Sequence, residues 1–231
     1  IMQRITPLVV GRDPFNVEAI WQDMFALTYR SVRGIPPLTR QQRALVTAMS
    51  ATDIAVWDLM GKAIGRPVHA LLGGALRDRV PAYVSGPFLK PGADPYRDFD
   101  ADIDGYLRTG YRAMKLRMGV APKTDAKLLA RVRERVGADF PLMVDLNEGA
   151  GTERAALAFG EAFREHDLVW LEEPIRADNL PGYTRLARSL PMALAGGEAL
   201  LGVTPFRDYL SAGALDIVQP DLALCGGFSE G

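Results

Sequence analysis

Apolar residues in the first third of the chain recur every three or four positions, which is the spacing of one face of an α-helix. The segment after Asn16 has this spacing, and Asn16 is its expected N-cap. A second helix is expected from Thr39 to about Gly65, because Thr39 and Gln42 have the spacing of a capping box. Residues 68–72 are expected to form a short third helix, closed by two glycines. The pattern therefore predicts a helical N-terminal part.

From about residue 80 the pattern changes to short apolar runs separated by helical stretches. Six strands are expected, at residues 80–84, 113–118, 142–146, 169–171, 192–195 and 217–218. The helices expected between them span residues 124–137, 152–166 and 180–190, with a further helix that begins at Thr204. This alternation of strand and helix predicts parallel βαβ units.

Two α/β architectures contain such units, the closed barrel and the doubly wound open sheet. No Gly-x-Gly-x-x-Gly sequence and no phosphate-loop lysine follows a predicted strand, which disfavours a nucleotide-binding open sheet. We therefore predict an α/β fold in which residues 79–231 form a (β/α) TIM-type barrel and residues 1–78 a separate helical domain. A complete barrel takes about 250 residues, so six strands make an incomplete one, and we expect a piece of a longer enzyme.

Polar residues end five successive predicted strands, at the positions where a (β/α) barrel builds its active site. These ends carry, in chain order, Lys115 and Arg117, Asp145 and Asn147, Glu172, Glu198 and Asp221. Asp145, Glu172 and Glu198 are separated by 27 (172 − 145) and 26 (198 − 172) residues, about one βα unit each. We expect these three carboxylates to converge. Because converging carboxylates repel one another, we expect a hard divalent cation such as Mg²⁺ to bind between them and offset their negative charge.

A single acid at the end of a strand has a simpler interpretation, since it often caps the following helix or lies solvated at the rim. Five strands that all end in charge are harder to explain in this way. Glu173 is expected to be structural, because adjacent residues of a strand point to opposite faces and Glu172 takes the inner one. The two histidines, His69 and His166, are also expected to be structural.

Composition and charge narrow the class of protein. The chain of 231 residues is 48% hydrophobic and 24% charged, which is enough apolar material for a sizeable core. With 27 basic and 28 acidic residues, it has no basic surface for nucleic acid or an anionic membrane. The single cysteine, Cys225, forms no internal disulfide, and no apolar run is long enough to cross a membrane. We expect a cytoplasmic homo-oligomer that binds a small molecule.

Motifs in both parts of the chain point to one family. The helical part carries SATDIAVWDLMGK at residues 50–62, GRPV at 65–68 and LLGG at 71–74. The barrel part carries KLR at 115–117, DLN at 145–147, EEP at 172–174, GE at 197–198 and PD at 220–221. In this order the motifs resemble the enolase superfamily, specifically the mandelate racemase/muconate lactonizing enzyme family. The resemblance covers essentially the whole chain, and the combination is far more specific than any single motif.

The resemblance implies a reaction and a set of ligands. Family members remove the proton α to a carboxylate and form an enediolate held by Mg²⁺, whose ligands would here be Asp145, Glu172 and Glu198. Residues 1–78 would be the helices of an α+β capping domain whose first strands are missing. Since the enediolate carries a second negative charge, Lys115 and Arg117 lie where they could stabilise it. Asn147 is the expected contact to the carboxylate substrate.

Two departures from the family pattern select among its reactions. Many relatives have Lys-x-Lys on the second strand, whereas here Arg117, a poor base, takes the place of the second lysine. Asp221 matches an aspartate that in the racemase subgroup pairs with a histidine base on the seventh strand, and that histidine would lie beyond Gly231. These features favour a lyase that dehydrates an acid sugar to a 2-keto-3-deoxy acid. The alternatives are a racemase or epimerase of a hydroxy acid that uses Lys115, and a catalytically silent metal-binding barrel.

Overall fold

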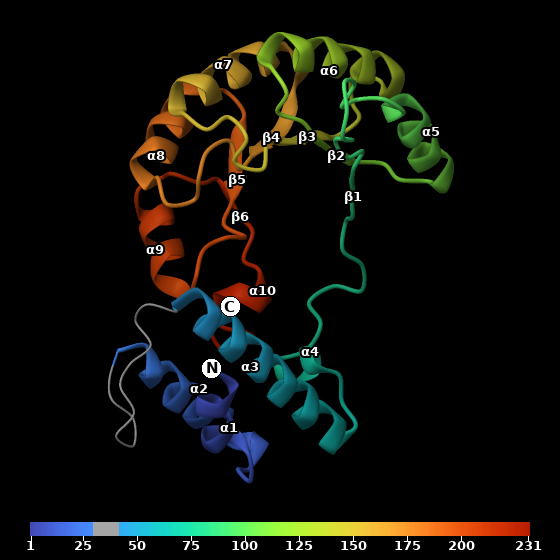
Figure 1. Ribbon diagram of the computed structural model, residues 1–231. Coiled ribbons are helices and arrows are strands. Elements are labelled where there is room, and N and C mark those ends of the chain that lie inside the picture. Colours follow the sequence, from blue (N-terminus) through green and yellow to red (C-terminus); the bar gives the residue numbers. More distant parts are fainter. Residues whose placement is uncertain (30–41) are drawn as a thin grey trace. The chain divides into compact units, whose positions relative to one another are not determined.

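The computed structural model describes residues 1–29 and 42–231, and these residues form two compact units (Figure 1). The first unit comprises Ile1–Arg79, Glu198–Arg207 and Pro220–Gly231, and the second comprises Val80–Gly197 and Asp208–Gln219. Two late segments therefore belong with the N-terminal helices. None of the described helices has the length and apolar character needed to cross a bilayer.

The first unit is helical. It contains α1 (Met2–Val9), α2 (Val17–Phe25), α3 (Gln42–Ile64), α4 (Val68–Leu71) and α10 (Leu222–Cys225), with short 3₁₀ turns at Pro14–Asn16 and Ala26–Thr28. Buried apolar side chains of the early helices form one core, and its larger members include Ile20, Trp21, Met24, Leu45, Met49 and Met60. They recur at helical spacing, so the apolar pattern of the sequence accounts for α2 and α3.

Several local predictions for this unit differ from the structure. Helix α1 was not predicted, because Pro7 lies inside it and a proline normally interrupts a helix. Asn16 occupies the N-cap position of α2, as predicted, but its side chain makes no capping bond. Asp13 caps the preceding 3₁₀ turn instead, by accepting a hydrogen bond from the backbone N–H of Phe15 (2.9 Å). Thr39, the predicted cap of α3, lies outside the described residues.

Residues 226–229, which we call the docking turn, are hydrogen-bonded to α2 and α3 within the first unit. The Trp21 indole donates to the Gly226 carbonyl (2.9 Å), and the Gly226 N–H donates to the Ser50 hydroxyl (3.0 Å). Buried Asp53 accepts from both the N–H (3.1 Å) and the hydroxyl of Ser229. These bonds join residues far apart in the sequence, with separations of 205 positions for Trp21–Gly226 and 176 for Ser50–Gly226 and Asp53–Ser229.

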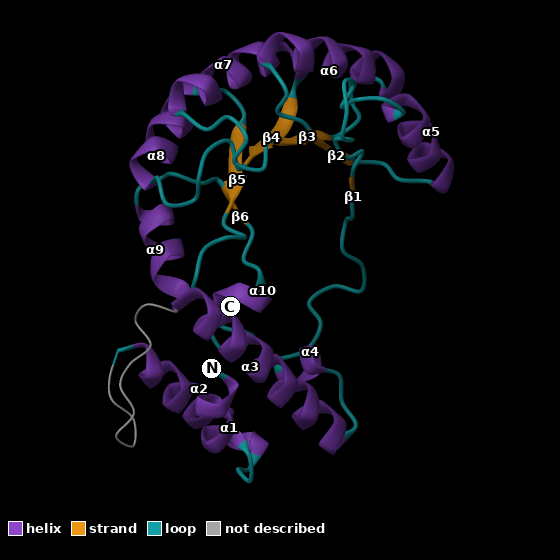
Figure 2. Cartoon of the chain, viewed as in Figure 1, coloured by secondary structure: helices purple, strands orange, loops and turns teal. Residues whose placement is uncertain are grey.

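The second unit is a parallel sheet with helices on its outer side (Figure 2). Its strands are β1 (Val84–Ser85), β2 (Met114–Arg117), β3 (Leu142–Asp145), β4 (Leu168–Glu172), β5 (Ala193–Gly196) and β6 (Ile217–Val218). The helices that follow the first five strands are α5 (Phe99–Thr109), α6 (Pro122–Val136), α7 (Glu153–Phe163), α8 (Leu180–Ser189) and α9 (Val203–Ser211), and the residues of α9 up to Arg207 belong to the first unit. Strand order equals chain order from β1 to β6. A doubly wound sheet would reverse its order, so the predicted barrel-type arrangement is confirmed.

The second unit also differs from the prediction in two places. The first strand was expected at residues 80–84, but only Val84 and Ser85 pair with β2, and Val80 is largely exposed. Helix α5 was not predicted, since Phe99 and Ile103 are its only buried residues and give little periodicity. The remaining strands lie where they were predicted, within one or two residues at their ends.

The register of the central strands positions the site. Arg117 pairs with Asp145, and Asp145 pairs with Glu172, so the last residues of β2, β3 and β4 lie side by side. The residues just before them, Leu116, Val144 and Leu171, are completely buried. The apolar core thus fixes three charged strand ends at the same height of the sheet.

Candidate active site

Four charged side chains meet at the carboxyl ends of β2, β3 and β4, and we call them the strand-end cluster: Lys115, Arg117, Asp145 and Glu172. Lys115 Nζ forms ion pairs with Asp145 Oδ2 (3.2 Å) and with Glu172 Oε1. Arg117 Nη1 lies 2.7 Å from the same Asp145 oxygen. Asp145 and Glu172 are each 1% exposed, and Lys115 is 7% exposed. Two buried carboxylates are therefore balanced by two cations.

Burial and charge shift the pKa values in this cluster. Burial, followed by the charge of Glu172, raises the pKa of Asp145 to about 6 against the opposing effect of the two cations. Burial also disfavours the charge of Glu172, but hydrogen bonds from Lys115 and neighbouring donors outweigh it and lower the Glu172 pKa. Burial disfavours the charge of Lys115 as well, yet its bond to Glu172 leaves the Lys115 pKa raised. Lys115 is thus held as a cation.

Two further residues contact the cluster and were not predicted from the sequence. Trp170 Nε1 and Gln219 Nε2 both donate to Glu172 Oε2, each at 2.9 Å. Trp170 lies two positions before Glu172, so strand periodicity could have placed it on the same face. Gln219 directly follows β6, and nothing in the sequence pattern distinguishes it from other polar residues there.

In the turns after β3 and β4, three residues other than glycine have a left-handed backbone conformation. Asn147, Glu148 and Glu173 have φ values of 47°, 61° and 40°. Such conformations cost about 1–3 kcal/mol each and persist where the surroundings impose them. The Asn147 N–H donates to Asp145 Oδ1 (2.8 Å), so this turn holds the Asp145 carboxylate, while the Asn147 side chain is exposed. Glu173 is 3% exposed.

The other predicted residues lie outside the strand-end cluster. Glu198 is exposed, two residues after β5, and Asp221 is exposed and caps α10 by accepting from the Ala223 N–H (2.8 Å). Both belong to the first unit. His166 lies two residues before the start of β4, at the opposite end of that strand from Glu172. Burial lowers the pKa of His166. His69 lies in α4 of the first unit.

Comparison with protein families matches both parts of the chain. Residues 98–231 match the enolase C-terminal domain-like family, and residues 1–73 match the mandelate racemase/muconate lactonizing enzyme N-terminal domain. The chain belongs to the mandelate racemase/muconate lactonizing enzyme family of the enolase superfamily. The family resemblance seen in its motifs is thereby confirmed.

The chain is similar to individual family members whose names give two different reactions, cycloisomerisation and dehydration. It is 37% identical over 231 residues to D-galactarolactone cycloisomerase from Agrobacterium fabrum, and 35% identical over 231 residues to D-galactonate dehydratase from Xanthomonas oryzae. These alignments cover 100% and 96% of the chain, but only 58% and 56% of the two relatives. The chain thus spans little more than half the length of these curated family members.

Solved structures of the family have the same fold. A racemase from Streptomyces coelicolor A3(2), solved with bound magnesium, superimposes with a TM-score of 0.86 at 34% identity. The match covers 99% of this chain and 65% of that one. The six-stranded sheet described here therefore corresponds to part of an enolase-superfamily barrel.

The donor atoms of the strand-end cluster are suited to the cation of this family. Asp145 and Glu172 offer only oxygen ligands, which Mg²⁺ prefers, and they come from adjacent strands in register. Within residues 1–29 and 42–231, the structure assembles no group of three or more acidic, histidine or cysteine side chains that could hold a metal. The two buried carboxylates fit Mg²⁺ as part of a ligand set that needs further oxygens.

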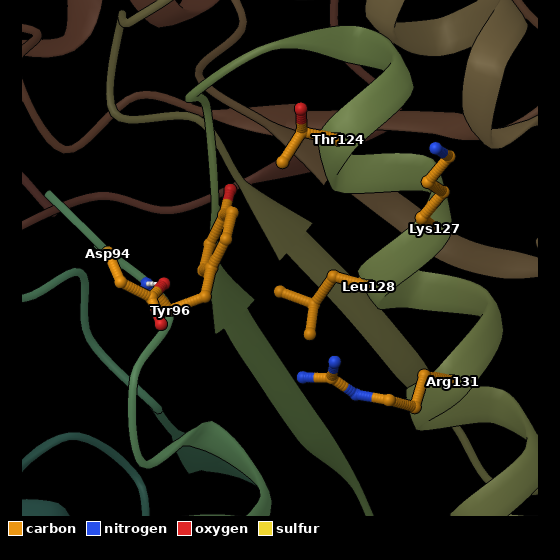
Figure 3. A pocket seen from close by; sticks show the side chains of 6 residues that line it. All are labelled: Asp94, Tyr96, Thr124, Lys127, Leu128 and Arg131. Atoms are coloured by element: carbon orange, nitrogen blue, oxygen red, sulfur yellow. Dashed lines mark hydrogen bonds between the residues drawn. The ribbon is translucent and has the colours of Figure 1, made fainter.

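A pocket of about 380 Å³ lies elsewhere on the second unit, between α6 and the loop that precedes α5 (Figure 3). Its lining residues are Asp94, Tyr96, Thr124, Lys127, Leu128 and Arg131. Behind it, the Tyr96 hydroxyl donates to buried Asp125 (2.7 Å). None of the lining residues belongs to the strand-end cluster, so this pocket is separate from the candidate active site.

Proposed function

We propose that this family member removes the proton α to a carboxylate in a Mg²⁺-dependent reaction and dehydrates an acid sugar to a 2-keto-3-deoxy acid. The observation that carries the proposal is the strand-end cluster, in which two buried carboxylates meet buried Lys115 and half-buried Arg117 where β2, β3 and β4 end. Family membership and the dehydratases among its relatives support the same reaction.

The cations of the cluster are suited to the charge that this reaction creates. Removal of the α-proton converts a carboxylate into an enediolate with two negative charges, and donors already fixed in place stabilise it at little reorganisation cost. Lys115 and Arg117 are such donors, because ion pairs with Asp145 already hold both side chains. Mg²⁺, when bound, supplies additional positive charge beside the substrate carboxylate.

Other residues take their roles from the family resemblance. Asp145 and Glu172 are the proposed Mg²⁺ ligands within the cluster, and Glu198 is the proposed third ligand. Asn147, whose exposed side chain follows β3, is the proposed substrate contact. Asp221 is the proposed partner of a histidine base. After the α-proton is removed, loss of the β-hydroxyl as water leaves an enol, which becomes the 2-keto-3-deoxy acid by tautomerisation.

A second candidate function is isomerisation, as racemase, epimerase or cycloisomerase. It is supported by the similarity to D-galactarolactone cycloisomerase, which extends over the whole chain. A racemase or epimerase shares the first step, proton removal α to a carboxylate, and differs in the fate of the enediolate, which regains a proton at the same carbon instead of losing water. A cycloisomerase forms or breaks a ring bond, also without loss of water.

An exchange experiment in D₂O distinguishes these possibilities. The protein is incubated with Mg²⁺ and a panel of aldonates and aldarates, while NMR follows the α-proton and a carbonyl reagent measures keto acid. Dehydration gives keto acid, whereas racemisation or epimerisation gives exchange without keto acid. If the protein binds Mg²⁺ but neither signal changes for any acid, the chain is a catalytically silent barrel and the proposal is wrong.

Two matched variants test whether α-proton exchange depends on the strand-end cluster. Lys115→Met removes one cation of the cluster and is expected to abolish exchange. Lys127→Met makes the same change on the exposed surface of α6 and is expected to leave exchange at the wild-type rate. Equal rates in the two variants would contradict a role for Lys115.

A further inference from the structure

The two oxygens of the Glu172 carboxylate have different surroundings. Oε1 accepts from the ammonium group of Lys115, a buried cation that also pairs with Asp145. Oε2 accepts from two neutral donors, the Trp170 indole and the Gln219 amide, each at 2.9 Å. One oxygen is thus bound by a charged group, and the other is bound by two groups that carry no charge.

We propose that Trp170 and Gln219 are positioning residues that hold Glu172 by Oε2, so that Oε1 is the oxygen this side chain offers to a divalent cation. The inference rests on the proposed function, because it takes Glu172 as a Mg²⁺ ligand. It adds which oxygen binds the cation, which residues orient it, and which group, Lys115, must give up that oxygen.

The packing around Trp170 supports a positioning role. Its ring meets the ring of Tyr83 edge to face, with centroids 5.4 Å apart and an angle of 76° between the planes. An indole has one N–H and no acceptor, so this arrangement leaves the N–H a single direction, toward Glu172. Tyr83 also lies beneath Lys115 Nζ, 5.8 Å from the ring centroid. The same tyrosine therefore contacts the groups on both sides of the carboxylate.

Gln219 is held independently of Trp170. Its backbone N–H donates to the Gly196 carbonyl at the end of β5 (2.9 Å), which fixes the residue just after β6. An ionised carboxylate only accepts hydrogen bonds, so the Gln219 side chain faces it with its NH₂ group. Two donors from different strands thus bind the same oxygen.

Neutral donors suit this role for an electrostatic reason. A cation that approaches Oε1 is repelled by the ammonium of Lys115 but not by an indole or an amide. Hydrogen bonds to a ligating carboxylate fix its orientation, and loss of such a partner typically weakens metal binding by about 10–100-fold. We expect this range for removal of either donor.

The test measures Mg²⁺ affinity by calorimetry for the full chain and two variants. Trp170→Phe keeps an aromatic ring against Tyr83 but loses the N–H and the bulk of the second ring, while Gln219→Met keeps the length of the side chain and loses the amide. Each is expected to raise the dissociation constant for Mg²⁺ by about 10–100-fold with the thermal unfolding temperature nearly unchanged. Trp57→Phe is the matched control, because that indole donates to Ser229 in the first unit.

Tryptophan emission provides a second readout that does not depend on activity. The chain has three tryptophans, and only Trp170 bonds to the strand-end cluster. Addition of Mg²⁺ is expected to change the emission of the wild type and of Trp57→Phe, and not that of Trp170→Phe. If the wild type binds Mg²⁺ and both Trp170→Phe and Gln219→Met bind it within twofold as tightly, the positioning role is wrong and the proposed function stands. If the wild type binds no Mg²⁺, both are overturned.

Discussion

The docking turn contains a glycine whose replacement has a cost that the structure allows us to estimate. Gly227 has φ of +84°, a left-handed conformation that costs a residue with a side chain about 1–2 kcal/mol. A Cβ added there would lie 2.6 Å from the Cβ and 2.7 Å from the Cγ of Asp53, and closer still to its Oδ2. Asp53 is buried and bonded to Ser229, so it cannot easily move away.

Gly227→Ala therefore combines backbone strain with overpacking, and overpacking of a filled interior typically costs about 1–3 kcal/mol. We expect a total loss of about 2–5 kcal/mol in the free energy of unfolding of the first unit. Gly65→Ala is the matched control, because Gly65 has φ of +66° in the same unit and an added Cβ there has nothing within 4 Å. This variant pays the backbone cost alone.

Urea denaturation followed by tryptophan emission measures both losses. In a Trp170→Phe background the remaining indoles, Trp21 and Trp57, belong to the first unit and bond to the docking turn. The difference between Gly227→Ala and Gly65→Ala isolates the clash with Asp53. If Gly227→Ala costs no more than Gly65→Ala, the close packing of the docking turn against α3 is not what stabilises this unit.

Three further outcomes are expected. Arg117→Met removes one cation beside Asp145 and should slow α-proton exchange by about 10²–10³-fold, as loss of an oxyanion donor does; an unchanged rate would exclude its electrostatic role. Asp125→Ala leaves the three N–H groups of residues 119–121 and the Tyr96 hydroxyl without their acceptor. It should lower the free energy of unfolding, measured by urea denaturation, by more than about 3 kcal/mol, whereas Tyr96→Phe should lower it by about 0.5–1.5 kcal/mol. Thr152→Ala removes the cap bond to the Ala155 N–H and should cost about 1 kcal/mol by the same measurement, and Thr109→Ala, which caps no helix start, should cost less.

The sequence was sufficient to predict β2, β3 and β4 because each is a short, largely apolar run that ends in a charged residue. That pattern reflects burial of Leu116, Val144 and Leu171 immediately before the charged strand ends. Once strand order and register are known, Asp145 and Glu172 become neighbours. The first strand was less predictable, because two paired residues leave almost no period to detect.

The residues around Glu172 show where sequence reasoning stops. Trp170 and Gln219 donate to the same oxygen of Glu172. Gln219 lies 47 positions after Glu172 in the sequence, and no local pattern carries information over that separation. Asn147 was predicted for its side chain, yet the structure uses its backbone N–H to hold Asp145. The chemistry of a strand end can be predicted from residue type, but the partners that orient it depend on the fold.

The docking turn has a consequence for how the chain folds as it is made. Helix α3 emerges from the ribosome well before its partner, since Asp53 and Ser229 are 176 residues apart. At a translation rate of about 5–20 residues per second, α3 waits about 9 to 35 seconds for that partner. Throughout this interval the Asp53 carboxylate and the Trp21 and Trp57 indoles remain open to water or to chaperones. The first unit therefore closes only after the strands of the second unit have been synthesised.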